Sequence, residues 1–113
     1  MSQRQVRLFI EDMLETINKI EQFTKGYREK GFERDALVSS AVIRQLEILG
    51  EAAANIPETV RANYAHIPWR RIVGLRNMLI HAYFEVDLSI IWQVVTVNLP
   101  ETKKQLKEML KDF

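Results

Sequence analysis

The sequence predicts an all-α protein, an up-and-down bundle of five helices with a kinked last helix. Apolar residues recur every three or four positions along most of the chain, and this spacing is typical of one face of an α-helix. No segment shows the sustained apolar and polar alternation of a half-buried strand. Gly26, Gly31, Pro57 and Pro68 interrupt the pattern, and these interruptions separate the predicted helices.

The first two predicted helices are long. Residues 6–20 form the first, whose apolar face consists of Val6, Phe9, Ile10, Met13, Leu14, Ile17 and Ile20. Asp35 is the expected N-cap of the second helix, which continues to Ile56. Pro57 then ends that helix and begins a short third one, and Pro68 opens a fourth.

The last predicted helix carries two apolar stripes. The first keeps one phase across Pro100, which therefore predicts a kink in a continuous helix: Leu88, Ile91, Trp92, Val95, Leu99, Leu106, Met109, Leu110 and Phe113. The second stripe is Ile90, Val94 and Val97, and it points away from the first. Because an exposed helix face is normally polar, either a second chain or a neighbouring helix of the same bundle should cover this stripe.

The composition is that of a soluble globular protein. The 113 residues fit a single domain over residues 1–113, with 47% hydrophobic and 27% charged residues. No apolar run approaches the length of a membrane span, and the first residues lack the apolar core of a signal peptide. With no cysteine there is no disulfide framework. We therefore expect a cytoplasmic protein that does not associate with membranes.

The near-neutral charge conceals a basic segment. The chain carries a net +1, but residues 59–84 contain no Asp or Glu. This segment has a charge of +4, contributed by Arg61, Arg70, Arg71 and Arg76. The remaining 12 basic and 15 acidic residues therefore sum to −3. A basic patch on an acidic background indicates a polyanionic ligand.

Within this segment, Arg76, Asn77, His81 and Tyr83 bring together groups that can cleave a phosphodiester. An imidazole acts as a base or an acid near neutral pH, and a guanidinium fits a phosphate bidentately. The two His are fifteen positions apart and no Cys is present, so the sequence offers no recognisable metal-ligand set, and no cofactor is expected. Together, these groups are chemically able to cleave RNA without a metal ion.

Helical geometry constrains how these side chains can meet. Five residues of regular helix place His81 about 140° around the axis from Arg76, so the two do not share a face. Tyr83, seven residues on, would lie nearly above Arg76, while Asn77 and His81 can touch. A common cleft requires either that the helix break near His81 or that two chains pack their motifs together.

The pattern Arg-x4-His-x-Tyr, preceded by Ile67-Pro68-Trp69-Arg70, resembles the HepT-like branch of the HEPN superfamily. Further segments that resemble the same family lie upstream and downstream of the motif: residues 43–52, Val86-Asp87-Leu88 and Asn98-Leu99-Pro100. The resemblance implies a small helical toxin that acts as a metal-independent RNA endonuclease. It also implies a composite site at a dimer interface, and inhibition by a partner nucleotidyltransferase of the minimal MNT type.

We assign roles to the motif on this basis. His81 is the expected general base and Arg76 the residue that holds the phosphate, with Asn77, Arg70 and Arg71 as further substrate contacts. The resemblance implies that Tyr83 accepts adenylyl groups from the partner transferase. The expected assembly is a homodimer or a higher homo-oligomer.

Other interpretations remain open from the sequence. His81 could simply stabilise a helix C-terminus, and the arginines could form a solvated face. Arg44, Glu47 and Glu51 have the spacing of surface ion pairs on one helix, while the resemblance of residues 43–52 to the family leaves open a role at an interface or in the site. The chain could also be a non-catalytic nucleotide-binding or scaffolding subunit of a two-component nucleotidyltransferase, or a structural adaptor. An adaptor would leave the basic segment unexplained.

Overall fold

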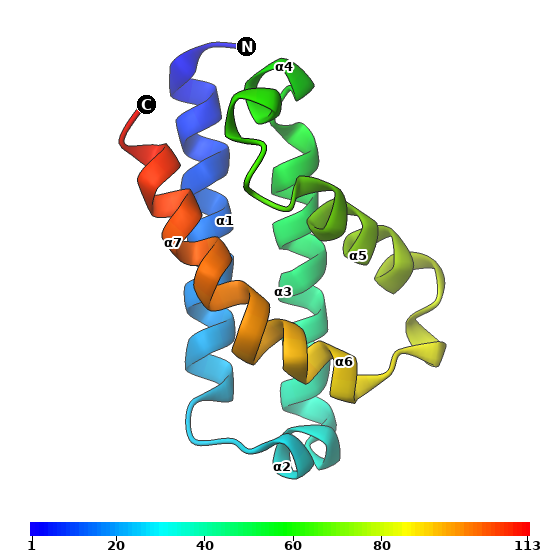
Figure 1. Ribbon diagram of the computed structural model, residues 1–113. Coiled ribbons are helices and arrows are strands. Elements are labelled where there is room, and N and C mark those ends of the chain that lie inside the picture. Colours follow the sequence, from blue (N-terminus) through cyan, green and yellow to red (C-terminus); the bar gives the residue numbers. More distant parts are fainter.

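Two long antiparallel helices, α1 (Gln3–Thr24) and α3 (Ala36–Asn55), form the centre of the molecule (Figure 1). The computed structural model describes residues 1–113 except for the side chain of Tyr83, and it contains no strand among the described residues. Apolar side chains meet between the two helices with the predicted spacing: Ile10, Met13, Ile17, Ile20, Val42, Leu46 and Leu49 are all buried. The all-α prediction is confirmed.

The helix boundaries follow the local signals in the sequence. Asp35 caps α3, because its side chain accepts a hydrogen bond from the Val38 amide at 3.1 Å. The Tyr27 hydroxyl donates to the same carboxylate at 2.5 Å and lowers the pKa of Asp35 below its ordinary value. Pro57 precedes the short helix α4 (Glu58–Arg61), which continues into the 3₁₀ turn η1 (Ala62–Tyr64).

One short helix was not predicted. Helix α2 (Glu29–Arg34) lies between α1 and α3, and Gly31 is inside it. Its single buried side chain, Phe32, packs against Trp92 with ring centroids 5.1 Å apart. Six residues are too few to show a helical period, and a distant aromatic contact supports this segment.

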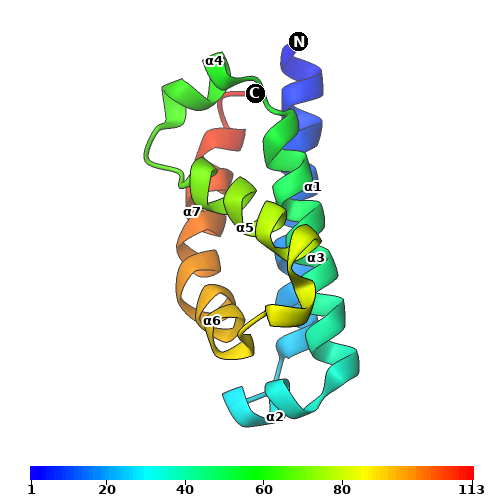
Figure 2. The same ribbon diagram turned by 90° about the vertical axis from the view of Figure 1, so that its right-hand side faces the viewer.

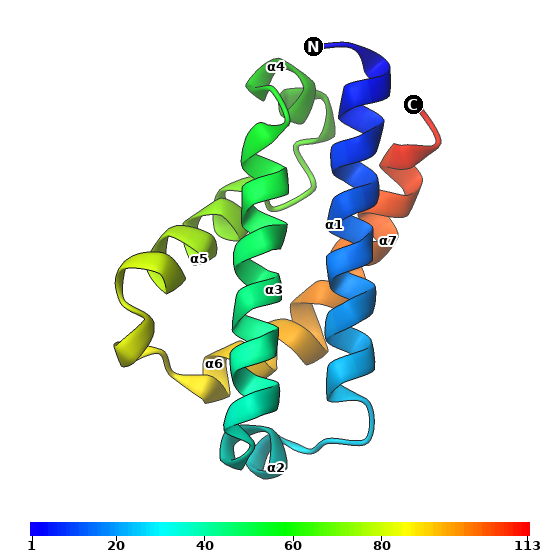
Figure 3. The ribbon, with the colours of Figure 1, turned by 180° about the vertical axis from the view of Figure 1, so that it is seen from behind.

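The C-terminal part is a nearly continuous helix, as predicted, but the irregularity begins before Pro100. Helix α6 (Leu88–Gln93) leads into a π-helical stretch, η3 (Val94–Asn98), and then into α7 (Leu99–Leu110). Pro100 has no amide to donate, and its ring crowds the carbonyl four residues earlier. The wider π turn accommodates that crowding. Helix α7 packs along α1, and the two chain ends lie at the same end of the molecule (Figure 3).

Helix α5 (Trp69–His81) lies across α3 (Figure 2), and it diverges from the bundle toward its C-terminal end (Figure 1). Trp69, Ile72 and Leu79 form its buried face, and the Trp69 indole donates to the Tyr64 carbonyl at 3.0 Å. Pro68 stands at its N-cap position, as predicted. This helix carries the Arg-x4-His motif. Within the described chain, no helix has both the length and the apolar character needed to cross a membrane.

Candidate active site

Arg76 is held on the side of α5 that faces α3. Its stem lies over Gly50, where a Cβ atom would overlap Arg76 Cβ, approach Arg76 Cγ to 2.9 Å and approach the Ile72 carbonyl oxygen to 3.1 Å. Glycine therefore permits the close crossing of α3 and α5. The whole Arg76 side chain is 28% exposed.

The Arg76 guanidinium contacts two neighbouring side chains. Its Nη2 donates to Glu51 Oε2 on α3 at 2.5 Å, and its Nη1 donates to Asn77 Oδ1 at 2.9 Å. Its Nε is buried and has no hydrogen-bond partner among the described residues. The amide oxygen of Asn77 thus supports the arginine, and its amide nitrogen remains a donor that a substrate can use.

His81 stands at the exposed end of α5. The helix ends at this residue, because Ala82 leaves the helical conformation with φ −138° and ψ 35°. Among the described residues the His81 side chain has no hydrogen-bond or ion-pair partner, and the residue is exposed, so its ring is accessible. A cleft formed within one chain requires a helix break near His81. The helix does break there, but after His81 and not between Arg76 and His81.

The structure does not bring Arg76 and His81 onto one face within one chain. Helix α5 is continuous from Arg76 to His81, so the angle of about 140° expected for a regular helix applies. The placement of Tyr83 above Arg76 requires a regular helix through Tyr83, and this condition is not met, because residues 83–85 form a separate 3₁₀ turn, η2 (Tyr83–Glu85). The side chain of Tyr83 lies outside the described part of the structure.

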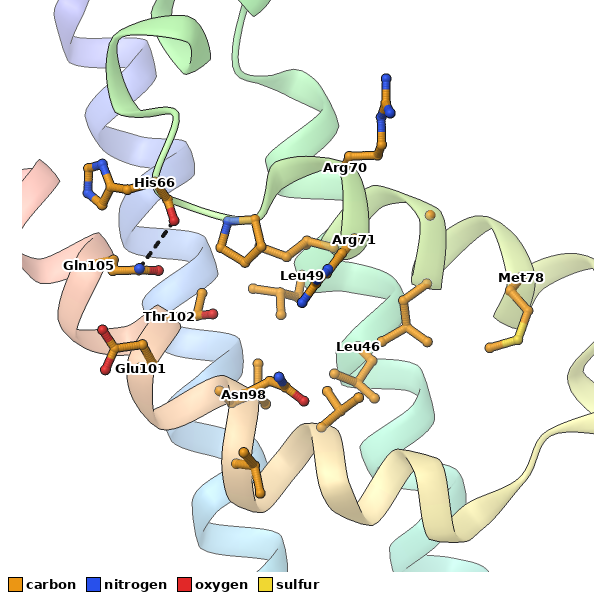
Figure 4. A pocket seen from close by; sticks show the side chains of 17 residues that line it. Leu46, Leu49, His66, Arg70, Arg71, Met78, Asn98, Glu101, Thr102 and Gln105 are labelled. Atoms are coloured by element: carbon orange, nitrogen blue, oxygen red, sulfur yellow. Dashed lines mark hydrogen bonds between the residues drawn. The ribbon is translucent and has the colours of Figure 1, made fainter.

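A groove of about 940 Å³ opens on the other side of α5 (Figure 4). Its walls are α5 and the segment η3–α7, and Leu46 and Leu49 of α3 lie at its base. Arg71 points into the groove whereas Arg70 points away from it, although both residues contribute to its lining. At one end, Gln105 Nε2 donates to the His66 carbonyl at 3.2 Å.

The second apolar stripe borders this groove. Val94 and Val97 line it, as does Met78 of α5. Ile90 is 53% exposed and Val97 60% exposed. No helix of the described chain covers these two side chains, so the alternative in which a neighbouring helix of the same bundle buries the stripe is wrong for them.

From the sequence, a contribution of this part of α3 to the site is only the second of two interpretations. Glu51 was grouped with Arg44 and Glu47 as a surface ion-pair residue, and Arg44 does pair with Glu47 at 3.3 Å. Glu51 instead reaches Arg76, 25 residues away. The available signal was a glycine in mid-helix directly before a glutamate. Among the described residues, no group of three or more His, Asp and Glu side chains could hold a metal ion together.

Comparison with known proteins identifies the family. The model of the family described as "Ribonuclease HepT-like" matches residues 13–109. The chain belongs to the HepT-like family. This membership confirms the resemblance seen in the motif and supports a ribonuclease of the HEPN type.

Three relatives match over nearly their whole length. A Methanocaldococcus jannaschii protein provisionally named an RNase is 38% identical over 113 residues, covering 100% of this chain and 93% of the relative. A second from the same organism is 40% identical over 107 residues, covering 95% of this chain and 98% of the relative. "Probable ribonuclease HepT" of Thermococcus cleftensis is 40% identical over 103 residues, covering 91% of this chain and 94% of the relative. No solved structure matches the chain.

Proposed function

We propose that this protein is a metal-independent RNA endonuclease. The observation that carries the proposal is a guanidinium fixed by the fold, at Arg76, on the same short helix as an accessible imidazole, at His81. Arg76 keeps N–H donors beyond those given to Glu51 and Asn77, and these can bind a phosphate. The HepT-like family and the names of the relatives support the same class of reaction.

The reaction uses only groups of the protein and the RNA. The imidazole of His81 takes the proton of a ribose 2′-hydroxyl, and the 2′-oxygen attacks the adjacent phosphorus in line. The bond to the 5′-oxygen breaks, and this oxygen leaves with the electron pair and takes a proton from the imidazolium of His81, which returns to its neutral form. The products are a 2′,3′-cyclic phosphate and a 5′-hydroxyl. Arg76 stabilises the charge on the non-bridging oxygens, an effect worth about 3 kcal/mol per donor in comparable sites.

The basic segment supplies further contacts to the substrate. Asn77 offers its amide nitrogen beside Arg76, and Arg70 and Arg71 bind flanking phosphates on either side of α5. Such contacts position RNA without reading its sequence. DNA lacks the 2′-hydroxyl and should not be cleaved.

The active form is a homodimer or a higher homo-oligomer. Two observations support this proposal: Arg76 and His81 face different directions within one chain, and the groove leaves Ile90 and Val97 exposed. A second copy seated on the groove would cover the stripe and bring the two motifs to a shared cleft. Mixing Arg76→Ala with His81→Ala protein tests this, because a site built from two chains regains activity in the mixed dimer. Without such recovery, each site is made by a single chain.

In the cell, this nuclease would be the toxin of a toxin–antitoxin pair in the cytoplasm. Its antitoxin would be an MNT-type nucleotidyltransferase that adenylylates Tyr83. Each added AMP brings a phosphodiester anion to the end of α5, close in sequence to the groups that RNA requires. Modification would therefore silence the enzyme by competition and charge, without unfolding it.

Purified protein and a ribonucleotide oligomer test the nuclease proposal directly. We expect cleavage that EDTA does not affect, and its loss in His81→Ala and in Arg76→Ala while circular dichroism stays unchanged. Inhibition by EDTA that magnesium reverses would contradict the metal-free mechanism. Absence of cleavage by the wild type, combined with tight binding of nucleotide, would favour the non-catalytic subunit.

A further inference from the structure

The ion pair between Glu51 and Arg76 differs from most pairs in this structure. Among the described residues, the other ion pairs join residues three or four positions apart, except for Lys103–Glu21 between α7 and α1. The Glu51–Arg76 pair joins α3 to the centre of α5. It therefore ties the candidate phosphate-binding group to one of the two central helices of the bundle.

We infer that Glu51 is a positioning residue, which fixes the guanidinium of Arg76 in the orientation that the reaction needs. The inference rests on the nuclease proposal for its kinetic consequences. Glu51 does not itself contact the RNA in this scheme. Its role is to act through Arg76.

Both ends of the Arg76 side chain are fixed. At its base, the stem packs over Gly50, where even a methyl group would overlap it. At its tip, Nη2 and Nη1 are held by Glu51 and Asn77. An arginine side chain has many rotamers and normally loses this freedom when it binds a ligand. Here the fold has already removed that freedom before RNA arrives.

The engaged donors still leave the guanidinium able to bind phosphate. Arginine has five N–H donors, of which the structure shows one used on each terminal nitrogen. One further N–H on each of Nη1 and Nη2 remains for a phosphate oxygen. Glu51 is 57% exposed, so the ion pair lies at the surface of the molecule, where RNA can reach the guanidinium.

The same carboxylate has an opposing electrostatic effect. Its negative charge beside Arg76 weakens the attraction for RNA phosphates in the ground state. Removal of Glu51 should therefore lower kcat, because Arg76 is no longer aligned with the transition state, and should leave KM unchanged or lower it. If Glu51 contacted the RNA directly, its removal would instead raise KM.

Four variants distinguish the positioning of Arg76 by Glu51 from the effect of the Glu51 charge. Glu51→Ala removes the contact, and we expect kcat to fall by about ten- to a hundredfold. Glu51→Gln keeps an oxygen at the same reach and should retain kcat within about threefold, whereas Glu51→Asp keeps the charge but is one methylene shorter and should behave like Glu51→Ala. Glu11→Ala is the matched control, because Glu11 is 52% exposed and pairs with Arg7 on α1, and it should leave both constants unchanged.

If the kcat of Glu51→Ala equals or exceeds that of the wild type, the inference is overturned, and Glu51 instead competes with RNA for Arg76. A pattern in which Glu51→Asp is active and Glu51→Gln is not would also overturn it, because charge alone would then matter. A rise in KM with unchanged kcat would assign Glu51 to substrate contact.

A second measurement does not depend on catalysis. In ¹⁵N NMR spectra of the wild type, the Arg76 Nε–H group should give a resolved, slowly exchanging signal, because this atom is buried. The signal should broaden or exchange rapidly in Glu51→Ala and persist in Glu51→Gln. If RNA is not cleaved but this pattern is found, the nuclease proposal fails and the positioning by Glu51 stands. An unchanged signal in Glu51→Ala overturns the positioning.

Discussion

Replacement of Gly50 by alanine tests the close crossing of α3 and α5. On an open helix face, a Gly→Ala change stabilises a protein by about 1 kcal/mol, because glycine loses more backbone freedom on folding. At Gly50 the new methyl group would overlap Arg76 Cβ and lie 3.1 Å from the Ile72 carbonyl oxygen. These atoms belong to the base of a side chain and to the backbone, so they cannot move unless α5 moves.

The structure also supplies the matched control. Gly74 is likewise inside a helix, but a Cβ atom built there has no neighbour within 4 Å. Gly74 lines the groove, so in protein diluted below the range of association Gly74→Ala should gain about 1 kcal/mol of stability. For Gly50→Ala, overpacking costs about 1–3 kcal/mol against the same gain, so the net loss should be about 0–2 kcal/mol. The two variants should consequently differ by about 1–3 kcal/mol.

Urea unfolding followed by circular dichroism, at one protein concentration, measures this difference. We expect a lower midpoint for Gly50→Ala and a higher one for Gly74→Ala, with similar slopes. RNA cleavage should also fall in Gly50→Ala, because any shift of α5 moves Arg76. Equal stabilisation by the two substitutions would show that the crossing has room for a side chain, and would refute the reasoning.

Three other substitutions test assembly, regulation and capping. Val94→Glu puts a charge in the groove and should convert the dimer to a folded monomer, as light scattering would show; an intact dimer would place the interface elsewhere. Incubation with the cognate transferase, ATP and magnesium should add mass in AMP units and silence the wild type but not Tyr83→Phe, and modification mapped to another residue would refute this. Because the folded-state pKa of Asp35 is lowered, its ionised form stabilises the fold above about pH 4, and this stabilisation is lost as pH falls through the folded pKa. Urea unfolding between pH 2 and about pH 6 should thus show a steeper acid loss in the wild type than in Asp35→Asn, and parallel curves would contradict the assignment.

The sequence predicted the elements that depend on local signals. Periodicity along α1 and α3, the N-cap at Asp35 and the prolines at 57 and 68 are each determined within a few residues, so they were recognisable. Helix α2 was not, because its stability depends on the contact of Phe32 with Trp92, 60 positions away in the sequence. Local patterns carry no information about such a contact.

The site divides in the same way. Arg76 and His81 are close in sequence, and their chemistry is visible in the motif alone. Gly50 and Glu51 belong to the site only because α5 crosses α3 at that point, which depends on packing between helices. The spacing of Glu51 from Glu47 and Arg44 on α3 fits an ordinary surface ion-pair pattern equally well.

The exposed groove and the divided motif have one explanation if the protein is a dimer. One side of α5 is buried, a second directs Arg76 toward α3, and a third faces the groove. On a regular helix with its sides placed in this way, His81 points about 140° away from Arg76 and does not face the phosphate held by the Arg76 of the same chain. The chain that covers Ile90 and Val97 would then also supply the missing group, so assembly and activity would be coupled. Specific activity should accordingly rise with protein concentration until the dimer is saturated, over the same range in which light scattering detects association. A specific activity that stays constant across that range would show that one chain completes its own site.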